Sequence, residues 1–148
     1  AVCYLDIDGF KAINDSLGHH AGDSALVEVA SRLSLEVRSG DTVARLGGDE
    51  FVMLFAEPGA VADIQAVLDR ILLSLSQVPL AGGRKGVSAS VGVTLFPMDD
   101  GSPDTLLRHA DKAMYQAKRT GRAGYCFFYP LMEGCRPPDL RREHLSSH

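Results

Sequence analysis

The sequence predicts an α/β domain, an α+β sandwich in which helices are packed around a central mixed sheet. Short apolar segments typical of strands alternate along the chain with longer segments whose apolar residues recur every three or four positions. In addition, the strand-like segments 42–46 and 51–55 flank a Gly-Gly-Asp-Glu turn, which predicts a β-hairpin. The hairpin makes part of the sheet antiparallel and therefore excludes a purely parallel, doubly wound fold.

The first half of the chain is predicted to contain three strands and two helices. A short apolar run over residues 1–7 predicts a buried strand. Apolar residues at helical spacing predict a short helix over residues 9–17 and a longer one over residues 23–38. The two hairpin strands follow, and the glycines between them remove the steric cost of positive φ in a tight turn.

The second half is predicted to contain two helices and two strands. Five apolar residues at helical spacing predict a helix over residues 61–75. Residues 87–95 alternate between apolar and small residues, which predicts a half-buried strand. Ser102 followed by Pro103 is typical of a helix start, and the predicted helix ends at a glycine. Residues 125–129 form the last predicted strand.

Size and composition suit one globular domain, since the 148 residues are 45% hydrophobic and 23% charged. The net charge of −4 creates no basic field that would attract nucleic acid or a membrane surface. No apolar run approaches the roughly 18 residues of a membrane span, and no signal peptide is recognisable. Three cysteines without metal-ligand spacing are expected to be reduced thiols. We therefore expect a cytoplasmic domain, although its parent protein could be anchored in a membrane.

Acidic residues occur at two turns that could lie close together. Asp6 and Asp8 end the first strand, and Asp49 and Glu50 occupy the hairpin turn. If the first strand lies beside the hairpin, Asp6 and Asp49 converge and raise each other's pKa unless a cation neutralises them. Oxygen ligands without cysteine or histidine point to Mg²⁺ or Mn²⁺. On spacing alone, two acidic turns exposed to solvent are the commoner explanation.

Basic residues and a helix start offer a possible phosphate site. Phe10 and Lys11 begin a short helix directly after the acidic strand end, where free backbone N–H groups could meet a phosphate. Lys118 and Arg122 lie four residues apart at the end of the last long helix. The alternatives are that Phe10 belongs to the core, that Lys11 is a surface residue, and that the later pair only complements the helix dipole.

Four segments together resemble one family. The stretches DIDGFKAINDSLGHHAGDSAL, RLGGDEF, SVGV and ADKAMYQAKRTGR occur in the order and rough spacing of the GGDEF family, and the pentapeptide itself, residues 47–51, is intact. Over residues 2–128 the chain closely resembles a bacterial diguanylate cyclase domain. The resemblance implies a fold like that of nucleotidyl cyclases and polymerase palm domains. It also implies that two GTP molecules are joined into cyclic di-GMP with release of two pyrophosphates.

The resemblance also implies roles for the acidic residues. The metal ligands of the family correspond to Asp6, the backbone carbonyl of Ile7, and Asp49, and Glu50 is expected to support metal binding or catalysis. Two Mg²⁺ or Mn²⁺ ions would activate the ribose 3′-hydroxyl and stabilise the leaving pyrophosphate.

Nucleotide recognition is implied by the same resemblance. Guanine recognition in the family corresponds to Asn14 and Asp23, which taken alone are more typical of helix caps. A carboxylate can accept from guanine N1–H and the exocyclic amine, and an amide can donate to O6 or N7, so GTP is expected to be preferred over ATP. The triphosphate is expected to contact one group of residues: Gly9, Phe10, Lys11, Lys118 and Arg122.

Two further expectations concern regulation. The reaction of the family needs a homodimer in which the two bound nucleotides face each other. Other domains of the parent chain are expected to arrange this homodimer. Arg38 and Asp41 stand at the position of the family's inhibitory product site, where an arginine can grip guanine O6 and N7. The alternative is that Arg38 only ends a helix and Asp41 is a loop residue. Arg70 is a weaker candidate for a second arginine contact.

The domain is expected to span residues 1–129, with residues 130–148 as a linker that resembles the connection to an EAL phosphodiesterase domain. We expect the chain to be a piece of a longer protein, in which the segment that precedes the first strand in the family would come before residue 1. In such a two-domain protein the alternative function is a catalytically silent module that binds GTP or cyclic di-GMP, and a mononucleotide cyclase of the same ancestry is a third possibility. The intact acidic and basic residues favour the enzyme.

Overall fold

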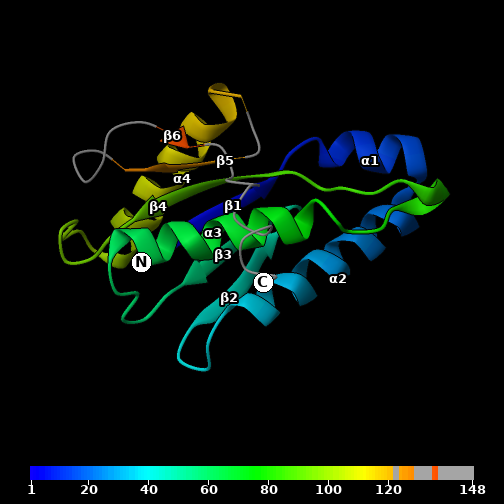
Figure 1. Ribbon diagram of the computed structural model, residues 1–148. Coiled ribbons are helices and arrows are strands. Elements are labelled where there is room, and N and C mark those ends of the chain that lie inside the picture. Colours follow the sequence, from blue (N-terminus) through cyan, green and yellow to red (C-terminus); the bar gives the residue numbers. More distant parts are fainter. Residues whose placement is uncertain (122–123, 129–134, 137–148) are drawn as a thin grey trace.

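A computed structural model describes residues 1–121, 124–128 and 135–136 of the chain (Figure 1). Its elements follow in this order: β1 (Val2–Ile7), α1 (Phe10–Leu17), α2 (His19–Glu36), β2 (Thr42–Gly47), β3 (Glu50–Leu54), α3 (Val61–Leu75), the short 3₁₀ helix η1 (Ala81–Gly83), β4 (Ala89–Thr94), α4 (Pro103–Arg119), β5 (Gly124–Phe127) and β6 (Cys135–Arg136). The described strands form one sheet in the order β2-β3-β1-β4-β5-β6. Among the described strands, β4 and β5 are the one parallel pair, so the predicted mixed sheet is confirmed.

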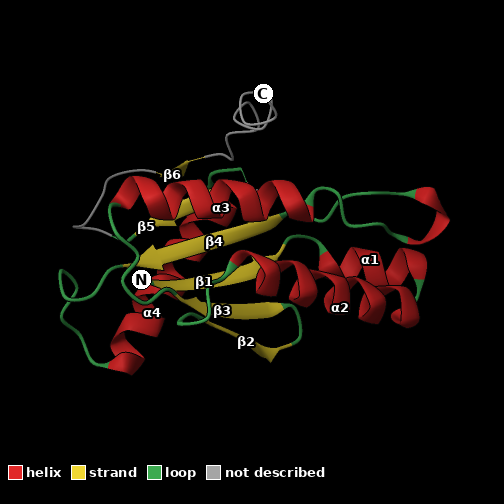
Figure 2. Cartoon of the chain, turned by 60° about the horizontal axis from the view of Figure 1, so that its bottom comes forward, coloured by secondary structure: helices red, strands yellow, loops and turns green. Residues whose placement is uncertain are grey.

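Helices cover both faces of the sheet. In Figure 2, α2 and α3 lie on one side of the strands and α4 lies on the other. The alternation of side chains along a strand divides β1 between these two environments. Cys3, Leu5 and Ile7 are fully buried among the residues of α2 and α3, whereas Asp6 faces the opposite way and contacts Lys118 of α4. The central strand therefore carries core residues on one face and polar residues on the other.

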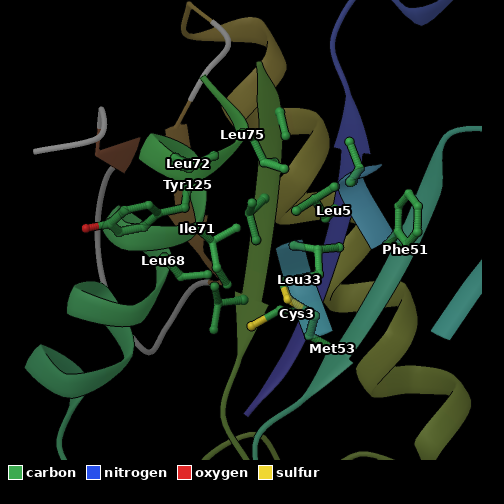
Figure 3. Packing of buried hydrophobic residues seen from close by; sticks show 14 of the residues in the cluster. Cys3, Leu5, Leu33, Phe51, Met53, Leu68, Ile71, Leu72, Leu75 and Tyr125 are labelled. Carbon is green, nitrogen blue, oxygen red and sulfur yellow. The ribbon is translucent and has the colours of Figure 1, made fainter. Parts of the chain in front are cut away.

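The main hydrophobic core lies between the sheet and the helices α2 and α3. Figure 3 shows Leu68, Ile71 and Leu72 of α3 on the β4 side of this core, and Leu33 of α2 belongs to the same cluster. The largest fully buried side chains come from six elements and one loop: Tyr125, Phe51, Leu5, Ile7, Leu33, Met53, Leu68, Ile71, Leu75, Val29, Val78 and Val91. Burying a side chain of this size stabilises the fold by ~1.5–3 kcal/mol, so this layer holds the sheet together.

Strand β4 is buried along its whole length, so the prediction of a half-buried strand over residues 87–95 is wrong for this segment. The reason is that α4 packs directly against it. A Cβ atom added to Gly92 would come 1.9 Å from the carbonyl oxygen of Ala110 and 2.2 Å from the amide nitrogen of Met114. Only glycine permits this approach of α4 to β4. The small residues of β4 alternate with apolar ones because α4 covers them, and this alternation looks like that of a strand with one face open to water.

The loop between β4 and α4 is held by a buried acid. Thr94 Oγ1 donates a hydrogen bond to Asp99 Oδ2 (2.6 Å), and His109 Nδ1 lies 2.6 Å from the same oxygen. The His109 ring is stacked on Phe128, with ring centroids 3.9 Å apart. These contacts connect the start of α4 to the end of β5. Ser102 caps α4 by accepting from the amide of Thr105, as its sequence predicts.

Two differences from the sequence-based expectations are local. Helix α2 begins at His19 rather than near Asp23, because Gly18, at φ 91°, separates α1 from α2 in a single residue. Cys3 is a free and buried thiol, but Cys126 is disulfide-bonded, so the expectation of reduced cysteines is wrong for Cys126. No helix in the described ranges has the length and apolarity that crossing a membrane requires. The predicted linker, residues 130–148, lies outside the described residues except for β6.

Candidate active site

The end of β1 and the hairpin turn meet because β1 pairs with β3. Asp6 is opposite Glu50 in this antiparallel pair, and the amide of Ile7 donates to the carbonyl of Asp49 (3.1 Å). Gly47 and Gly48 have φ values of 142° and 53°, which allow the chain to turn back just before the two acids. The structure therefore brings Asp6, Ile7 and Asp49 together, as expected if the strand lies beside the hairpin.

The Asp6 carboxylate is in an electrostatically unfavourable position. Its side chain is only 14% exposed, and its Oδ1 atom is buried without a hydrogen-bond partner. Burial and then the neighbouring charge of Asp49 raise the pKa of Asp6 to about 6, although Lys118 acts in the opposite direction. A divalent cation at this point would give the orphaned oxygen a partner and neutralise both carboxylates.

The donor set at this point fits Mg²⁺ or Mn²⁺. Two carboxylates, on Asp6 and Asp49, lie beside the backbone of Ile7, and all are hard oxygen donors. In the part of the chain that the structure describes, no three His, Cys, Asp or Glu side chains are grouped to hold a metal ion. An ion bound by so few protein ligands would need water or substrate phosphate oxygens to complete its shell, which is the usual situation for Mg²⁺.

Lys118 supplies the positive charge at the acidic cluster. Its Nζ atom lies 3.3 Å from Asp6 Oδ2 and 3.7 Å from Asp8 Oδ1. Asp8 is buried and also accepts hydrogen bonds from Ser88 Oγ (2.9 Å) and Ser90 Oγ (2.8 Å). The sequence predicts Asp8 at the acidic strand end but does not indicate a role for it. Alternation along β1 would have found it, because Asp6 and Asp8 must share a face of the strand.

Glu50 faces the same side of the sheet as Asp6, and its partner Tyr4 is not among the site residues predicted from the sequence. Tyr4 Oη donates a hydrogen bond of 2.5 Å to Glu50 Oε2. Burial and then the charge of Glu50 raise the pKa of Asp111 on α4, so this helix presents an acid close to Glu50. Tyr4 precedes Asp6 by two residues, and the same alternation predicts that both side chains point toward α4.

The start of α1 lies next to these acids. Gly9 precedes the helix in a left-handed conformation, at φ 64°, and the amide of Ile13 makes the first intrahelical bond, to the Gly9 carbonyl. The amides before Ile13 therefore have no intrahelical acceptor and are available to a phosphate. Lys11 is exposed, whereas Phe10 is partly buried against the core. The Phe10 side chain therefore packs against the core, as the alternative explanation predicted, whereas its backbone lies at the start of α1.

Asn14 and Asp23 do not cap helices, so their alternative explanation is excluded. The residues before α1 and α2 are Gly9 and Gly18, and neither helix has a side-chain cap. Asn14 lies against Gly22, where an added Cβ atom would come 1.7 Å from Asn14 Oδ1. Asn14 on α1 is therefore close to Asp23 on α2, and neither side chain has a hydrogen-bond partner among the described residues. Both are available to a ligand.

Arg38 and Asp41 line a separate cavity of about 150 Å³ that also contains Arg70. Asp41 accepts from the amides of Arg38 (3.0 Å) and Ala56 (2.9 Å), which explains the tight turn between α2 and β2. Arg70 Nε lies 3.2 Å from Glu36 Oε2, at the end of α2. The three predicted residues of this site are thus adjacent. Arg122, predicted to bind phosphate, lies outside the described residues.

Comparison with known proteins agrees with this geometry. A profile of the family described as "Diguanylate cyclase, GGDEF domain" matches residues 1–124. The bifunctional diguanylate cyclase/cyclic di-GMP phosphodiesterase MucR of Pseudomonas aeruginosa is 44% identical over 97% of this chain and 21% of its own length. The diguanylate cyclase TpbB of the same species is 45% identical over 82% of this chain and 28% of its own length. The chain thus spans less than a third of either relative.

A solved structure shows the same fold. The crystal structure of the GGDEF domain of TpbB, also called YfiN, superposes with a TM-score of 0.80 at 42% identity, covering 86% of this chain and 80% of that one. The predicted resemblance and fold class are therefore confirmed. On the family match, the sequence identities and the shared fold, the chain belongs to the GGDEF domain family of diguanylate cyclases.

Proposed function

We propose that this domain joins two molecules of GTP into cyclic di-GMP with release of two pyrophosphates. The observation that carries the proposal is the environment of Asp6, whose buried and unpartnered oxygen lies next to Asp49 at the end of β1. Such a cluster is unfavourable for the fold alone and becomes favourable when a cation binds. The intact acids and the family membership support a catalytic role for Asp6, Asp49 and Glu50.

In this proposal Asp6, the carbonyl of Ile7, and Asp49 hold Mg²⁺ or Mn²⁺. When bound, the metal would supply Lewis-acid activation of the 3′-hydroxyl and stabilise the charge of the leaving pyrophosphate. The amides at the start of α1, with Lys11, hold the triphosphate. Lys118 moves from its carboxylate partners toward a phosphate oxygen once the acids are neutralised.

Guanine recognition is assigned to Asn14 and Asp23. The proposal is supported by their closeness and by the lack of other partners for either side chain within the described chain. Asp23 also lines a hollow of about 360 Å³ between α2 and β2, together with Arg45. Adenine presents an acceptor where guanine presents N1–H, and an unpaired buried polar group costs ~1–3 kcal/mol. Selectivity for GTP over ATP should therefore be about fivefold or more.

Assembly and regulation are part of the same proposal. One domain holds one GTP, so two copies must face each other to bring each 3′-hydroxyl to the other α-phosphate. Domains outside residues 1–129 of a longer parent protein, in the cytoplasm, would arrange that homodimer. Arg38, Asp41 and Arg70 are proposed to bind the product cyclic di-GMP and hold the domains apart, because they line one cavity.

The decisive experiment incubates the purified protein with GTP and Mg²⁺ and resolves the products by chromatography. Cyclic di-GMP and pyrophosphate are expected, and chelation of the metal should stop their formation. Asp49→Ala should abolish turnover while leaving the circular dichroism spectrum unchanged. The matched control is Asp15→Ala, which removes an exposed acid of α1. Turnover by Asp49→Ala equal to that of the control would remove the metal assignment.

A silent module that binds GTP or cyclic di-GMP is the second candidate. Its support is that Lys118 already lies between Asp6 and Asp8, so the site is partly neutralised without any metal. Nucleotide binding measured by calorimetry, without any product, would favour this candidate. Formation of cyclic GMP would instead identify a mononucleotide cyclase.

A further inference from the structure

We propose that Tyr4 is a positioning residue that fixes the Glu50 carboxylate beside the metal and nucleotide site. The inference rests on the proposed function, since it takes Glu50 to be a member of that site. Tyr4 Oη and Glu50 Oε2 are 2.5 Å apart, which is the short distance typical of a hydroxyl donating to a charged carboxylate. Such bonds are about twice as strong as neutral ones.

The register of the sheet determines this contact. Tyr4 is opposite Val52 and Asp6 is opposite Glu50, so Tyr4 and Glu50 are diagonal neighbours on the same face of the β1–β3 pair. Diagonal side chains in such a pair are within reach of one another when one of them is aromatic. Tyr4 is partly exposed, and its hydroxyl contacts the Glu50 carboxylate.

Glu50 benefits from a donor because two of its neighbours are acids. Asp6 is opposite it on β1, and Asp111 faces it from α4 closely enough that the charge of Glu50 contributes to the raised pKa of Asp111. Without a donor, repulsion would turn the Glu50 side chain toward solvent. The Tyr4 hydroxyl is the donor that the structure supplies, at 2.5 Å from Glu50 Oε2. The phenol thus holds one carboxylate oxygen and leaves Oε1 free to face a cation.

The substitution that tests this is Tyr4→Phe, which removes the hydroxyl and keeps the ring. Tyr115→Phe is the matched control, because Tyr115 lies on α4, is 63% exposed and has no side-chain partner among the described residues. Mn²⁺ affinity is measured by electron paramagnetic resonance in the presence of a GTP analogue with a methylene group between the α- and β-phosphates. Residues that orient metal ligands typically contribute 10–100-fold to affinity, so Tyr4→Phe should weaken Mn²⁺ binding about tenfold, whereas Tyr115→Phe should leave it unchanged.

Coupling to Glu50 separates positioning from a structural role. Glu50→Gln should weaken Mn²⁺ binding by itself, because it removes the charged carboxylate. Adding Tyr4→Phe to it should weaken binding less than twofold further, because no carboxylate is left for Tyr4 to position. A structural role would instead lower the melting temperature in both backgrounds and leave the Mn²⁺ affinity of Tyr4→Phe within twofold of wild type. That result overturns the inference while the proposed function stands.

The remaining outcomes are also decisive. If Glu50→Gln does not change Mn²⁺ affinity, or if the wild type binds no Mn²⁺, the assignment of Glu50 to the site is refuted. The positioning role proposed for Tyr4 is then refuted as well. If wild type makes no cyclic di-GMP but Tyr4 and Glu50 are still coupled in Mn²⁺ binding, the proposed turnover fails and the positioning role of Tyr4 is supported.

Discussion

Replacing Asp49 with asparagine should stabilise the metal-free protein while abolishing its proposed activity. Asp49 is the charged neighbour that, after burial, contributes most to the raised pKa of Asp6. Asparagine removes that charge and keeps the shape of the side chain, and its amide can donate to the Asp6 carboxylate. The substitution therefore converts a repulsive neighbour into a hydrogen-bonding one.

The expected gain follows from the size of the pKa change. A rise from 3.8 to about 6 corresponds to ~3 kcal/mol if the whole change is counted. Burial is its largest cause, and solvent screens charges at the half-exposed turn, so the share of Asp49 should be ~0.5–1 kcal/mol. Folded Asp6 retains its proton at pH values where the unfolded chain has lost it, so wild-type stability falls as the pH rises from about 3.8 to about 6. The advantage of Asp49→Asn should open over this window and remain constant above it.

Urea unfolding in EDTA at a series of pH values measures this difference, with Asp15→Asn as the control for loss of an exposed acid. Adding Mg²⁺ with a GTP analogue should stabilise wild type more than Asp49→Asn, because a ligand that binds only the folded state adds to its stability. If Asp49→Asn is no more stable than Asp15→Asn at pH 7, the repulsion between Asp6 and Asp49 is not significant and the electrostatic reasoning is refuted.

Three further variants test separate parts of the structure. Gly92→Ala should destabilise the fold by ~2–3 kcal/mol in urea unfolding, because its Cβ would overlap the backbone of α4; Gly40→Ala, where the space is open, should change stability by less than ~0.5 kcal/mol. Asp99→Asn should lower stability at pH 7 by ~1 kcal/mol, since hydrogen bonds to its carboxylate outweigh burial and lower the pKa of Asp99. That loss should shrink below about pH 3.8, where wild type also loses the charge, and a loss independent of pH would contradict it. Glu36→Gln should release Arg70 from its ion pair and tighten cyclic di-GMP binding by ~2–5-fold in calorimetry. This range corresponds to the ~0.5–1 kcal/mol that an exposed ion pair contributes. Weaker binding would show instead that the ion pair organises the cavity.

Local patterns were sufficient to predict most elements, because each depends on residues close together in the chain. The capping serine at Ser102 and the apolar repeat of residues 61–75 placed α4 and α3 within a residue or two of their observed starts. The start of α2 was misplaced because Gly18 separates two helices without a loop. The full burial of β4 could not be predicted either, since it depends on α4 folding back over Gly92 from a distant part of the chain.

The candidate site was predictable only in part, and for a related reason. The convergence of Asp6 and Asp49 depends on β1 lying beside β3, which periodicity does not reveal. Asp8 and its serine partners depend on a second long-range pairing, between β1 and β4. The role of Tyr4 needs both the register of the hairpin and the direction of its side chain. The resemblance to the family identified Asp6 and Asp49 as candidate metal ligands. The order of the strands explains why these two acids lie close together.

The SVGV segment, residues 90–93, links the packing of α4 on the sheet to the position of Lys118 beside Asp6. Gly92 allows α4 to rest on the backbone of β4, and Met114, at the contact, lies one helical turn before Lys118. A side chain at residue 92 would push this turn of α4 away from the sheet, and the 3.3 Å contact between Lys118 and Asp6 would be lost with it. The absence of a side chain at one position in β4 therefore sets how closely the cation approaches the acids of β1. A change in how α4 packs on β4 must therefore also change the electrostatic interaction between Lys118 and Asp6.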